Sequence, residues 1–436
     1  MEIRPFKAYR YNEAAVGNAG SCISPPYDVI NSEQADELYK KSQYNIVRVI
    51  KGKTQPADSE GNNQYTRAAA YLNDWIKKGV LKQDSSENIY AYVQNFEIAG
   101  QEFERLTFIA LGKLEEFGKI VRPHEQTLSK PKIDRLNLQR ATQATFGLVF
   151  MLYEDKKKIA DKIIRKAEDQ KSAIDFVDEY EVRHRLFLIS DRNDIEQIEK
   201  MMEGKSVIIA DGHHRYETGL NYYKETGKPA AAYRAMAFTN TRNEGLIILA
   251  THHVVSNLKD FDIKNLIKKL KKNFEIAEYK FDSKPDKAKA KQKMLSQMKA
   301  EYEKDRNAFG IYSGKGVFYT AVLKNKKAMD KAAGNMSSAW RSLDVAVLHK
   351  LILEGLLGID EKKLAGESNI EYVKDTSTAI DDSIAKVDAG EKQVVFFMNP
   401  PKIEQIQKVA DAGEKMPQKS TYFYPKMYTG LTVNKL

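Results

Sequence analysis

The feature that most constrains this chain is an apolar run that passes straight into a glycine, two histidines and an arginine. Val207–Ala210 reads as a buried strand, and Asp211-Gly212-His213-His214-Arg215 follows it without a linker. A strand that enters a helix through a glycine turn favours anion binding, because the first N–H groups of the helix and its dipole face the ligand. The segment therefore predicts a phosphate-binding turn, formed by Gly212, His213, His214 and Arg215.

The same turn supplies candidate catalytic and metal-binding groups. His213 is a candidate acid or base, since histidine titrates near neutral pH. Asp211 has two interpretations. Its carboxylate could hold a divalent metal, which we expect to be Mg²⁺, or it could cap the helix that follows.

A second polar segment, Arg122-Pro123-His124-Glu125-Gln126-Thr127, lies between two apolar runs. A histidine beside a glutamate in a proline-ordered loop suits general acid–base chemistry, so His124 and Glu125 are candidate catalytic residues. Arg122 is a candidate phosphate contact. The alternative is a surface loop with an ordinary ion pair.

A third segment, Ser24-Pro25-Pro26-Tyr27-Asp28-Val29, is a turn whose prolines fix the backbone and present Tyr27 and Asp28. Asp28 and Glu125 are the two candidates for the base that accepts a substrate hydroxyl proton.

The C-terminal segment Met416–Lys426 is rich in aromatic residues and phosphate-compatible donors. It contains three candidate phosphate or nucleotide contacts, Lys419, Ser420 and Thr421. It is not a P-loop, because Gln418 stands where a glycine must precede the lysine. A substrate-covering loop and a buried aromatic loop are both compatible with this composition.

The order of apolar runs predicts a mixed α+β protein of the α/β class. We expect strands at 89–98, 107–112, 146–153, 185–189, 207–210, 245–250, 318–323 and 394–398, and helices at 67–77, 154–172 and 343–357. Apolar residues at helical spacing from Ile263 indicate one more helix with a buried face. Polar Thr251-His252-His253 is expected at the end of the 245–250 strand. We divide the chain into three regions, 1–154, 155–260 and 261–436.

Charge and cysteine content restrict the class of protein. The 436 residues carry a formal charge of +10, which favours anionic partners such as phosphorylated metabolites or nucleotides. The lysines at 268–272 are expected on a solvated helix face, and this dispersed charge argues against nucleic acid as a partner. A single cysteine, Cys22, excludes an intramolecular disulfide and cysteine-based zinc sites. With no apolar run long enough to cross a membrane, we expect a cytoplasmic protein.

Several of these segments together resemble a bacterial and archaeal family, the domain of unknown function family number ten-fifteen. The matching segments span almost the whole chain, at 25–29, 122–125, 210–215, 251–252, 342–345, 416–426 and 430–431. His253 departs from the arginine that the resemblance leads us to expect. The family is placed near the ParB/sulfiredoxin-like superfamily, so the resemblance implies a nucleotide-binding core with additional N- and C-terminal α/β regions.

The resemblance also implies a function, because that superfamily includes a free serine kinase that uses ADP. It implies phosphoryl transfer on serine or phosphoserine, by a serine-kinase-like enzyme or a phosphoserine phosphatase, with ADP or ATP and Mg²⁺ as cofactors. The alternative is a ParB-like nucleotide-binding protein that turns over no small molecule and associates with DNA.

Overall fold

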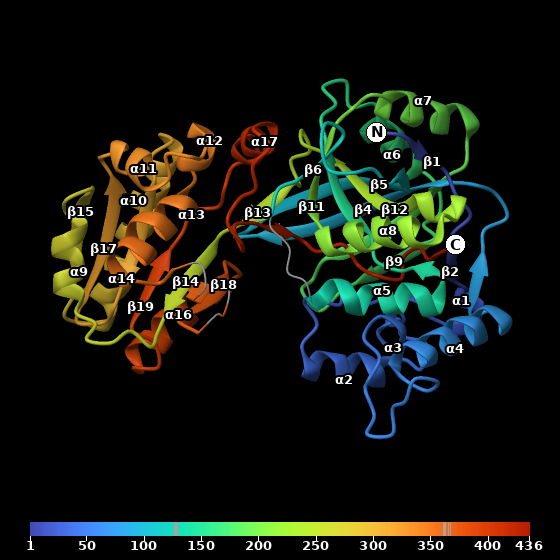
Figure 1. Cartoon of the computed structure of the whole chain (residues 1–436), viewed down its shortest axis with the longest axis horizontal. Helices are drawn as coiled ribbons and strands as arrows, with labels where there is room; N and C mark the ends of the chain where they lie inside the picture. The colour runs from blue at the N-terminus through green and yellow to red at the C-terminus, as the bar shows by residue number, and fades with distance from the viewer. Residues whose placement is uncertain (126–129, 361–362, 365, 367) are drawn as a thin grey trace. The chain divides into compact units, whose positions relative to one another are not determined.

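The chain folds into two compact units (Figure 1). The computed structural model describes residues 1–125, 130–360, 363–364, 366 and 368–436, so Gln126 and Thr127 of the second polar segment lie outside the described residues. Unit 1 comprises Met1–Pro123, Thr127–Ile247 and Pro425–Leu436, and unit 2 comprises His124–Gln126 and Ile248–Tyr424. Strands from the expected regions 1–154 and 155–260 lie together in the large sheet of unit 1, while residues 124–126 and 248–260 belong to unit 2.

Unit 1 is built on a mixed sheet. Its strands, in spatial order, are β6 (Val121–Pro123), β11 (Val207–Asp211), β8 (Val149–Tyr153), β12 (Tyr233–Asn240), β5 (Gln101–Lys113), β4 (Ile89–Ile98), β10 (Arg183–Ile189) and β9 (Ile174–Val177). β11 runs parallel to β6 and antiparallel to β8, while β12 runs parallel to β8. β1 (Ile3–Arg4) pairs with β5.

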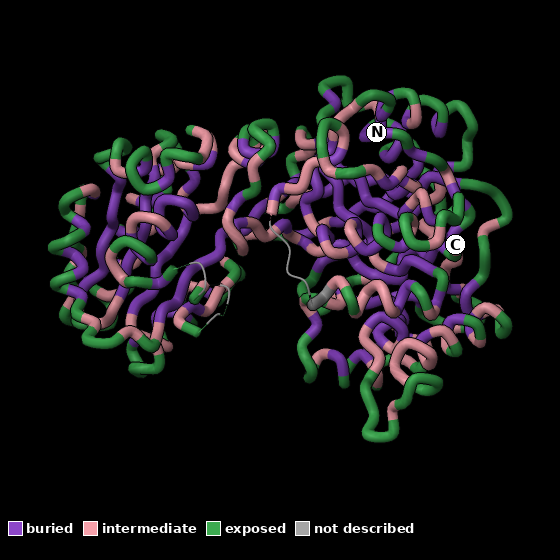
Figure 2. The backbone as a smooth tube through the Cα atoms, viewed as in Figure 1, coloured by how far each residue is buried: buried purple, intermediate pink, exposed green. Residues whose placement is uncertain are grey.

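The two faces of this sheet differ in chemistry because successive strand residues point to opposite sides. One face is apolar and packs against α6 (Ile159–Ala167) and α7 (Arg192–Met202). These residues form the large core of unit 1, and buried residues are coloured purple in Figure 2. The other face carries buried polar groups, among them Gln94 and Arg105. The C-terminal segment closes this face, because the carbonyl oxygen of Lys426 accepts from Gln94 Nε2 at 3.1 Å and the carbonyl oxygen of Pro425 accepts from Arg105.

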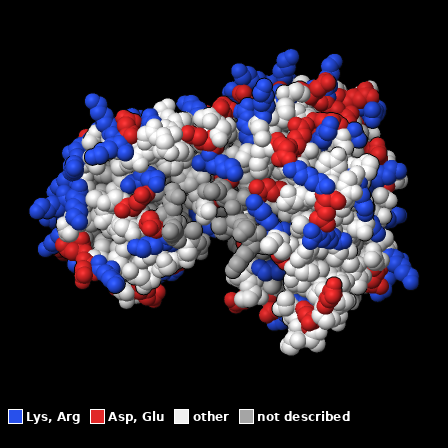
Figure 3. Space-filling view, viewed as in Figure 1, with Lys and Arg blue, Asp and Glu red and all other residues white. Residues whose placement is uncertain are grey.

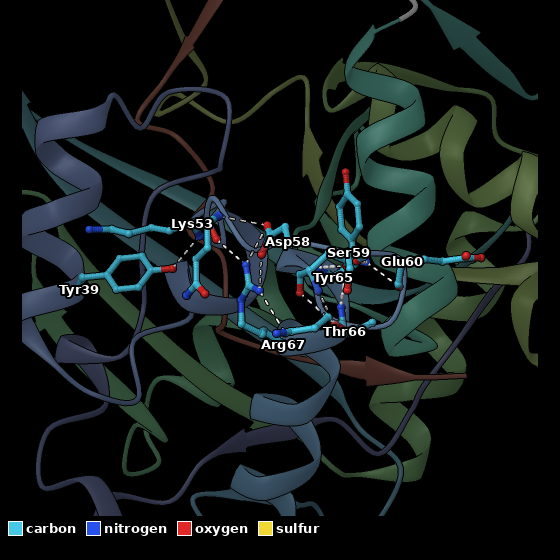
Figure 4. A network of polar contacts seen from close by, with 11 residues as sticks. Tyr39, Lys53, Asp58, Ser59, Glu60, Tyr65, Thr66 and Arg67 are labelled. Atoms are coloured by element: carbon cyan, nitrogen blue, oxygen red, sulfur yellow. Dashed lines mark hydrogen bonds and ion pairs between the residues drawn. The ribbon is translucent and has the colours of Figure 1, made fainter.

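Further helices of unit 1 pack against one another in chain order. They are α2 (Ser32–Lys41), α3 (Val47–Ile50), α4 (Gln64–Lys77), α5 (Lys130–Thr142) and α8 (His213–Thr226). The loop before α4 is fixed by Arg67, whose guanidinium binds the Asp58 carboxylate at 2.6 and 3.1 Å and the Lys53 carbonyl oxygen at 2.8 Å (Figure 4). Tyr65 of α4 donates to Asp134 of α5 at 2.8 Å, which ties the two helices together.

Unit 2 is built on an antiparallel sheet. Its order is β15 (Phe274–Lys280), β17 (Val317–Leu323), β16 (Ala308–Tyr312), β19 (Val394–Phe397), β14 (Thr251–Val255) and β18 (Ile370–Lys374). The helices α10 (Lys284–Glu303) and α16 (Ala379–Asp388) contribute to a core on one face, with Met294, Met298 and Ile384 against Phe318 and Phe397. A separate pair, β13 (Ile247–Leu249) and β20 (Tyr422–Tyr424), joins the ends of the 250–421 stretch.

Most of the predicted elements are confirmed, with three differences. The strand predicted at 89–98 is β4 and the helix predicted at 67–77 lies within α4. The helix predicted at 343–357 contains a π-helical turn at Leu348–Glu354 between α13 (Asp344–Val347) and α14 (Gly355–Leu357). The helix predicted at 154–172 is shorter in the structure, where it corresponds to α6. Thr251-His252-His253 does not end a strand, because these residues begin β14 and are buried in the sheet.

The lysine-rich helix is also confirmed. In α9 (Ile263–Leu270), Leu266, Ile267 and Leu270 are buried while the lysines at 268, 269, 271 and 272 are exposed. Figure 3 shows Lys and Arg side chains gathered over this end of unit 2. Within the described residues, no helix combines the length and apolar character that crossing a membrane requires.

The core of unit 1 makes a direct stability prediction. Phe108 is fully buried and its ring stacks on Phe238 with centroids 5.0 Å apart. Phe108→Ala should lower the free energy of unfolding by about 3–5 kcal/mol, because it removes buried apolar surface and leaves a cavity. Urea denaturation followed by circular dichroism measures this. Val177→Ala, at a side chain 60% exposed, is the control and should stay within about 0.5 kcal/mol of the original; equal effects of the two changes would contradict the assignment of this core.

Candidate functional site

The predicted glycine turn joins β11 to α8 in unit 1. Gly212 occupies the N-cap position of α8 with φ 88°, a left-handed conformation that favours glycine. A Cβ atom at this position would lie 2.9 Å from Arg215 Nε, so a side chain is also excluded by space. The requirement for glycine at 212 therefore comes from both the turn and the arginine folded over it.

Asp211 positions two cations at this turn. One of its carboxylate oxygens lies 3.2 Å from Arg215 Nη2 and 3.4 Å from Lys426 Nζ. Burial opposes ionisation of this carboxyl, but Lys426, Arg215 and His213 outweigh it and hold the pKa well below its usual range. Gly212, and not Asp211, occupies the N-cap position of α8, and the carboxylate of Asp211 contacts Arg215 and Lys426.

The surroundings of Asp211 do not fit a protein-held Mg²⁺. A hard divalent cation needs several oxygen ligands, whereas this carboxylate already faces an arginine and a lysine. Across the described residues, no group of three His, Cys, Asp or Glu side chains gathers as a metal site would require. The geometry suits an anion, which both cations attract.

Beside the turn lies a small cavity of unit 1, here called the arginine cavity. Its lining includes Tyr27, Arg135, Gln139, Gly147, Arg215, Thr218 and Arg234. Arg215 and Arg234 are only 4% and 6% exposed. Arg215 is held in place by a hydrogen bond to the carbonyl oxygen of Leu148 and by Asp211. Two guanidinium groups are therefore buried side by side around one small space.

Arg234 is the least compensated charge of the arginine cavity. Its Nη1 donates to Gln139 Oε1 at 3.2 Å, while its Nε and the Thr218 hydroxyl have no hydrogen-bond partner in the described part of the chain. Burial lowers the pKa of Arg234 to about 9, and repulsion from Arg215 contributes. An unpaired buried charge is costly, so these donors indicate a site that an anion completes.

The third predicted segment reaches the same cavity. Tyr27 lies under the guanidinium of Arg135, 4.0 Å from ring centroid to Cζ, and its carbonyl oxygen accepts from Lys51 at 3.3 Å. Asp28 beside it is exposed. Burial lowers the pKa of Arg215, but Asp211 and Asp28 outweigh this and hold it above its usual value. Asp28 therefore lies near the arginine cavity with its carboxylate in solvent.

Most of the remaining candidates form a separate group in unit 2. His124 Nε2 lies 2.8 Å from the Thr421 hydroxyl, and Glu125 Oε1 accepts from the backbone N–H of Lys419 at 2.8 Å. The Ser420 hydroxyl donates to the Pro417 carbonyl oxygen within the same loop. The second segment and the C-terminal segment thus meet, with His124 and Glu125 holding the loop. Arg122 lies in β6 of unit 1, beside Ile208 of β11.

Sequence reasoning identified the turn but missed much of the cavity beside it. Arg234 stands alone in an apolar strand, a pattern that signals a buried charge but not its neighbours. Lys426 belongs to the C-terminal segment and was given no role, although it contacts Asp211. Arg135 carried no distinguishing signal in its charged helix.

Comparison with known proteins identifies a family and finds several distantly similar solved structures. The family model described as "Protein of unknown function (DUF1015)" matches residues 3–346. No curated protein matches the chain. Similar solved structures include a free serine kinase in complex with AMP (14% identity, covering 71% of this chain and 91% of that chain, TM-score 0.33). Others are a conserved hypothetical protein from Pyrococcus furiosus (16%, 72% and 95%, 0.31) and C-terminally truncated SbnI from Staphylococcus aureus (9%, 75% and 87%, 0.33).

The arginine cavity predicts that replacing Arg234 raises the stability of the protein but removes its binding of anions. Arg234→Met should raise the free energy of unfolding by about 1 kcal/mol or more, because it replaces an unpaired buried charge with an apolar chain of similar length. Phosphate or pyrophosphate should raise the melting temperature of the original protein but not that of the variant. Differential scanning calorimetry measures both effects.

The control for this comparison is Arg183→Met, at an exposed arginine paired with Asp175. It should change the free energy of unfolding by no more than about 1 kcal/mol and should leave the response to phosphate intact. An Arg234→Met protein that is less stable yet still responds to phosphate would show that the cavity is not the anion site.

Proposed function

The chain belongs to the family described as "Protein of unknown function (DUF1015)", and we propose that it transfers a phosphoryl group to or from a hydroxyl-bearing amino acid, serine or phosphoserine. The observation that carries the proposal is the glycine turn at Gly212 beside two buried arginines. Phosphoryl transfer depends on positioning and charge stabilisation more than on covalent catalysis, and these are the properties that the site offers. We further propose that unit 1 holds a ParB/sulfiredoxin-like nucleotide-binding core.

The glycine turn and the arginine cavity together suit a phosphoryl group. The N–H groups that begin α8, with His214 and His213 at its first turn, suit the transferring phosphoryl group. Lys426 and Arg215, aligned by Asp211 at 3.4 and 3.2 Å, suit the charge that develops on its oxygens. The arginine cavity adjoins the turn through Arg215 and suits further oxygens of the same phosphate, which would accept from those donors of Arg234 and Thr218 that have no partner among the described residues.

The chemical step needs a base for the serine hydroxyl, and Asp28 fits this role. As the serine oxygen bonds to phosphorus, the bond from phosphorus to the leaving phosphate oxygen breaks and the hydroxyl proton passes to the Asp28 carboxylate. Asp28 is exposed, lies near Arg215 and belongs to the same unit. Glu125 is the weaker candidate, because its carboxylate already accepts the N–H of Lys419.

Nucleotide and metal enter the proposal in different ways. ADP or ATP is the proposed phosphoryl donor for the serine direction. No step is assigned to a metal held by Asp211, whose carboxylate binds two cations of the chain. The cationic character of the turn predicts that phosphate binding does not require Mg²⁺, which calorimetric titration of phosphate in EDTA would check.

The reaction is tested by phosphorus NMR of the full chain with Mg²⁺. Mixtures of phosphoserine with AMP or ADP, and of serine with ADP or ATP, separate the possible reactions. Nucleotide-dependent conversion supports kinase chemistry, and inorganic phosphate released without nucleotide supports a phosphatase. Binding without turnover in every mixture would overturn the proposal in favour of a nucleotide-binding protein, with DNA retention as the next measurement.

The role of Asp28 makes a separate kinetic prediction. Asp28→Asn should lower kcat by about 100- to 10,000-fold, the usual contribution of a general base, while substrate affinity stays within a few-fold. Asp169→Asn, at another exposed aspartate of unit 1, is the matched control and should keep full activity. A kcat that is unchanged in Asp28→Asn would remove Asp28 as the base.

A further inference from the structure

Unit 2 contains a cavity that the proposed function does not use. Its volume is about 650 Å³, and every residue that lines it belongs to unit 2. It lies beside the ends of the strands of the unit 2 sheet, where β17 and β19 end and β16 and β14 begin. The rest of the wall comes from α11 (Lys327–Ala332), α12 (Ser338–Arg341) and α17 (Ile403–Asp411). A cavity of this size is typical of small-molecule sites.

A carboxyl group lines this cavity together with side-chain amides. Asn307 Nδ2 donates to Asp344 Oδ1 at 2.6 Å and to the Ser342 carbonyl oxygen at 2.8 Å. Burial raises the pKa of Asp344 to about 7, although hydrogen bonds from Asn307 and Asn399 oppose the rise. A ligand N–H that donates to Asp344 would stabilise its ionised form.

The rim of the same cavity carries an excess of positive charge. Lys402 forms an ion pair with Asp305, and a hydrogen bond from Lys402, with the charges of Lys408 and Lys326, lowers the pKa of this exposed carboxyl. Three lysines thus act on one aspartate. Arg341 adds another cation, 3.1 Å from Asp330. Such a rim attracts an anionic group.

The histidines near the cavity do not contribute to this charge. His253 Nδ1 lies 3.1 Å from the Thr251 carbonyl oxygen, which can only accept, so Nδ1 carries the proton. Its Nε2 then accepts from His349 Nε2 at 3.0 Å. Burial lowers the pKa of both rings, that of His349 to about 4, so both are neutral near pH 7.

The C-terminal loop, which was predicted to contact phosphate or nucleotide, lines this cavity, and the second segment holds it there. Lys419 and Ser420 line it, and Glu125 fixes the backbone of Lys419. The loop between Met416 and Thr421 is therefore a wall of the unit 2 cavity, held by His124 and Glu125. This gives the second segment a structural task that does not depend on phosphoryl transfer in unit 1.

We propose that the unit 2 cavity binds a small molecule with an N–H donor at one end and a phosphate at the other. The N–H group donates to Asp344, and the phosphate lies among Lys326, Lys402, Lys408 and Arg341. A nucleoside monophosphate and phosphoserine both carry these two groups, so the test must separate them.

Tryptophan fluorescence provides a reporter for this cavity. The chain has two tryptophans, Trp75 in unit 1 and Trp340 in α12, between the lining residues Ala339 and Arg341. In Trp75→Phe, emission comes from Trp340 alone. AMP and phosphoserine are titrated separately, and a saturable change in Trp340 emission with either one identifies the class of ligand. If Trp75→Phe does not fold, isothermal titration calorimetry compares the original chain with Arg234→Met, so that binding to unit 1 is separated from binding to unit 2.

Two substitutions test the assignment of the ligand contacts. Asp344→Asn should weaken binding by about 10- to 100-fold, because it removes a charged hydrogen-bond acceptor. Asp382→Asn, at an exposed aspartate of α16, is the matched control and should leave binding unchanged. Lys408→Gln should weaken binding and reduce its dependence on salt.

This test of the unit 2 cavity does not depend on the proposed function of unit 1. Arg234→Met should retain the change in Trp340 emission even if it abolishes phosphate binding or turnover in unit 1. The proposal is overturned if neither ligand changes Trp340 emission or gives a heat of binding. It is also overturned if Asp344→Asn binds as tightly as the original chain.

Discussion

The structure of unit 1 depends on how it accommodates buried positive charge. Arg105, Arg215 and Arg234 are each at most 6% exposed, and a buried guanidinium must find acceptors for its fixed set of donors. Arg105 finds them in Gln94 and in the carbonyl oxygen of Pro425, so its burial fastens the C-terminal segment to the sheet. Arg215 finds them in Asp211 and Leu148. Nε of Arg234 finds no hydrogen-bond partner in the part of the chain that the structure describes.

The three buried arginines thus differ in how completely hydrogen bonds and ion pairs compensate their charge. This difference connects the stability of unit 1 with its proposed binding of anions. The fastening by Arg105 places Lys426 where it reaches Asp211, and Asp211 in turn aligns Arg215 over the glycine turn. The incompletely compensated charge of Arg234 lies in the arginine cavity. A folded protein keeps such a cost where binding offsets it, and functional sites are where it is usually found.

Unit 2 also surrounds a cavity with charged side chains, but this cavity is larger and contains carboxyl groups as well as cations. Its cavity is lined by the buried carboxyl of Asp344 and by several lysines, and burial keeps the nearby His253 and His349 neutral. The loop at Lys419 is held by the carboxylate of Glu125 through a backbone N–H group. His124 and Glu125, chosen from the sequence for proton transfer, therefore have a clear structural role within unit 2.

The sequence by itself determined the elements whose pattern is local. The β4 strand, the helices α4 and α9, and the glycine turn between β11 and α8 follow from residues adjacent in the chain, because hydrophobic periodicity and backbone conformation act over a few residues. The same short stretch predicts an anion-binding turn at Gly212 to Arg215, which stays a prediction. Sequence spacing could not show that Asp211 would contact both Arg215 and Lys426, since Lys426 is remote in the chain. Only the tertiary structure decided that Arg234 would lie beside Arg215, that Thr251-His252-His253 would enter a strand, and that the predicted residues would divide between two units. Those outcomes depend on long-range packing, which brings together groups that no local pattern relates.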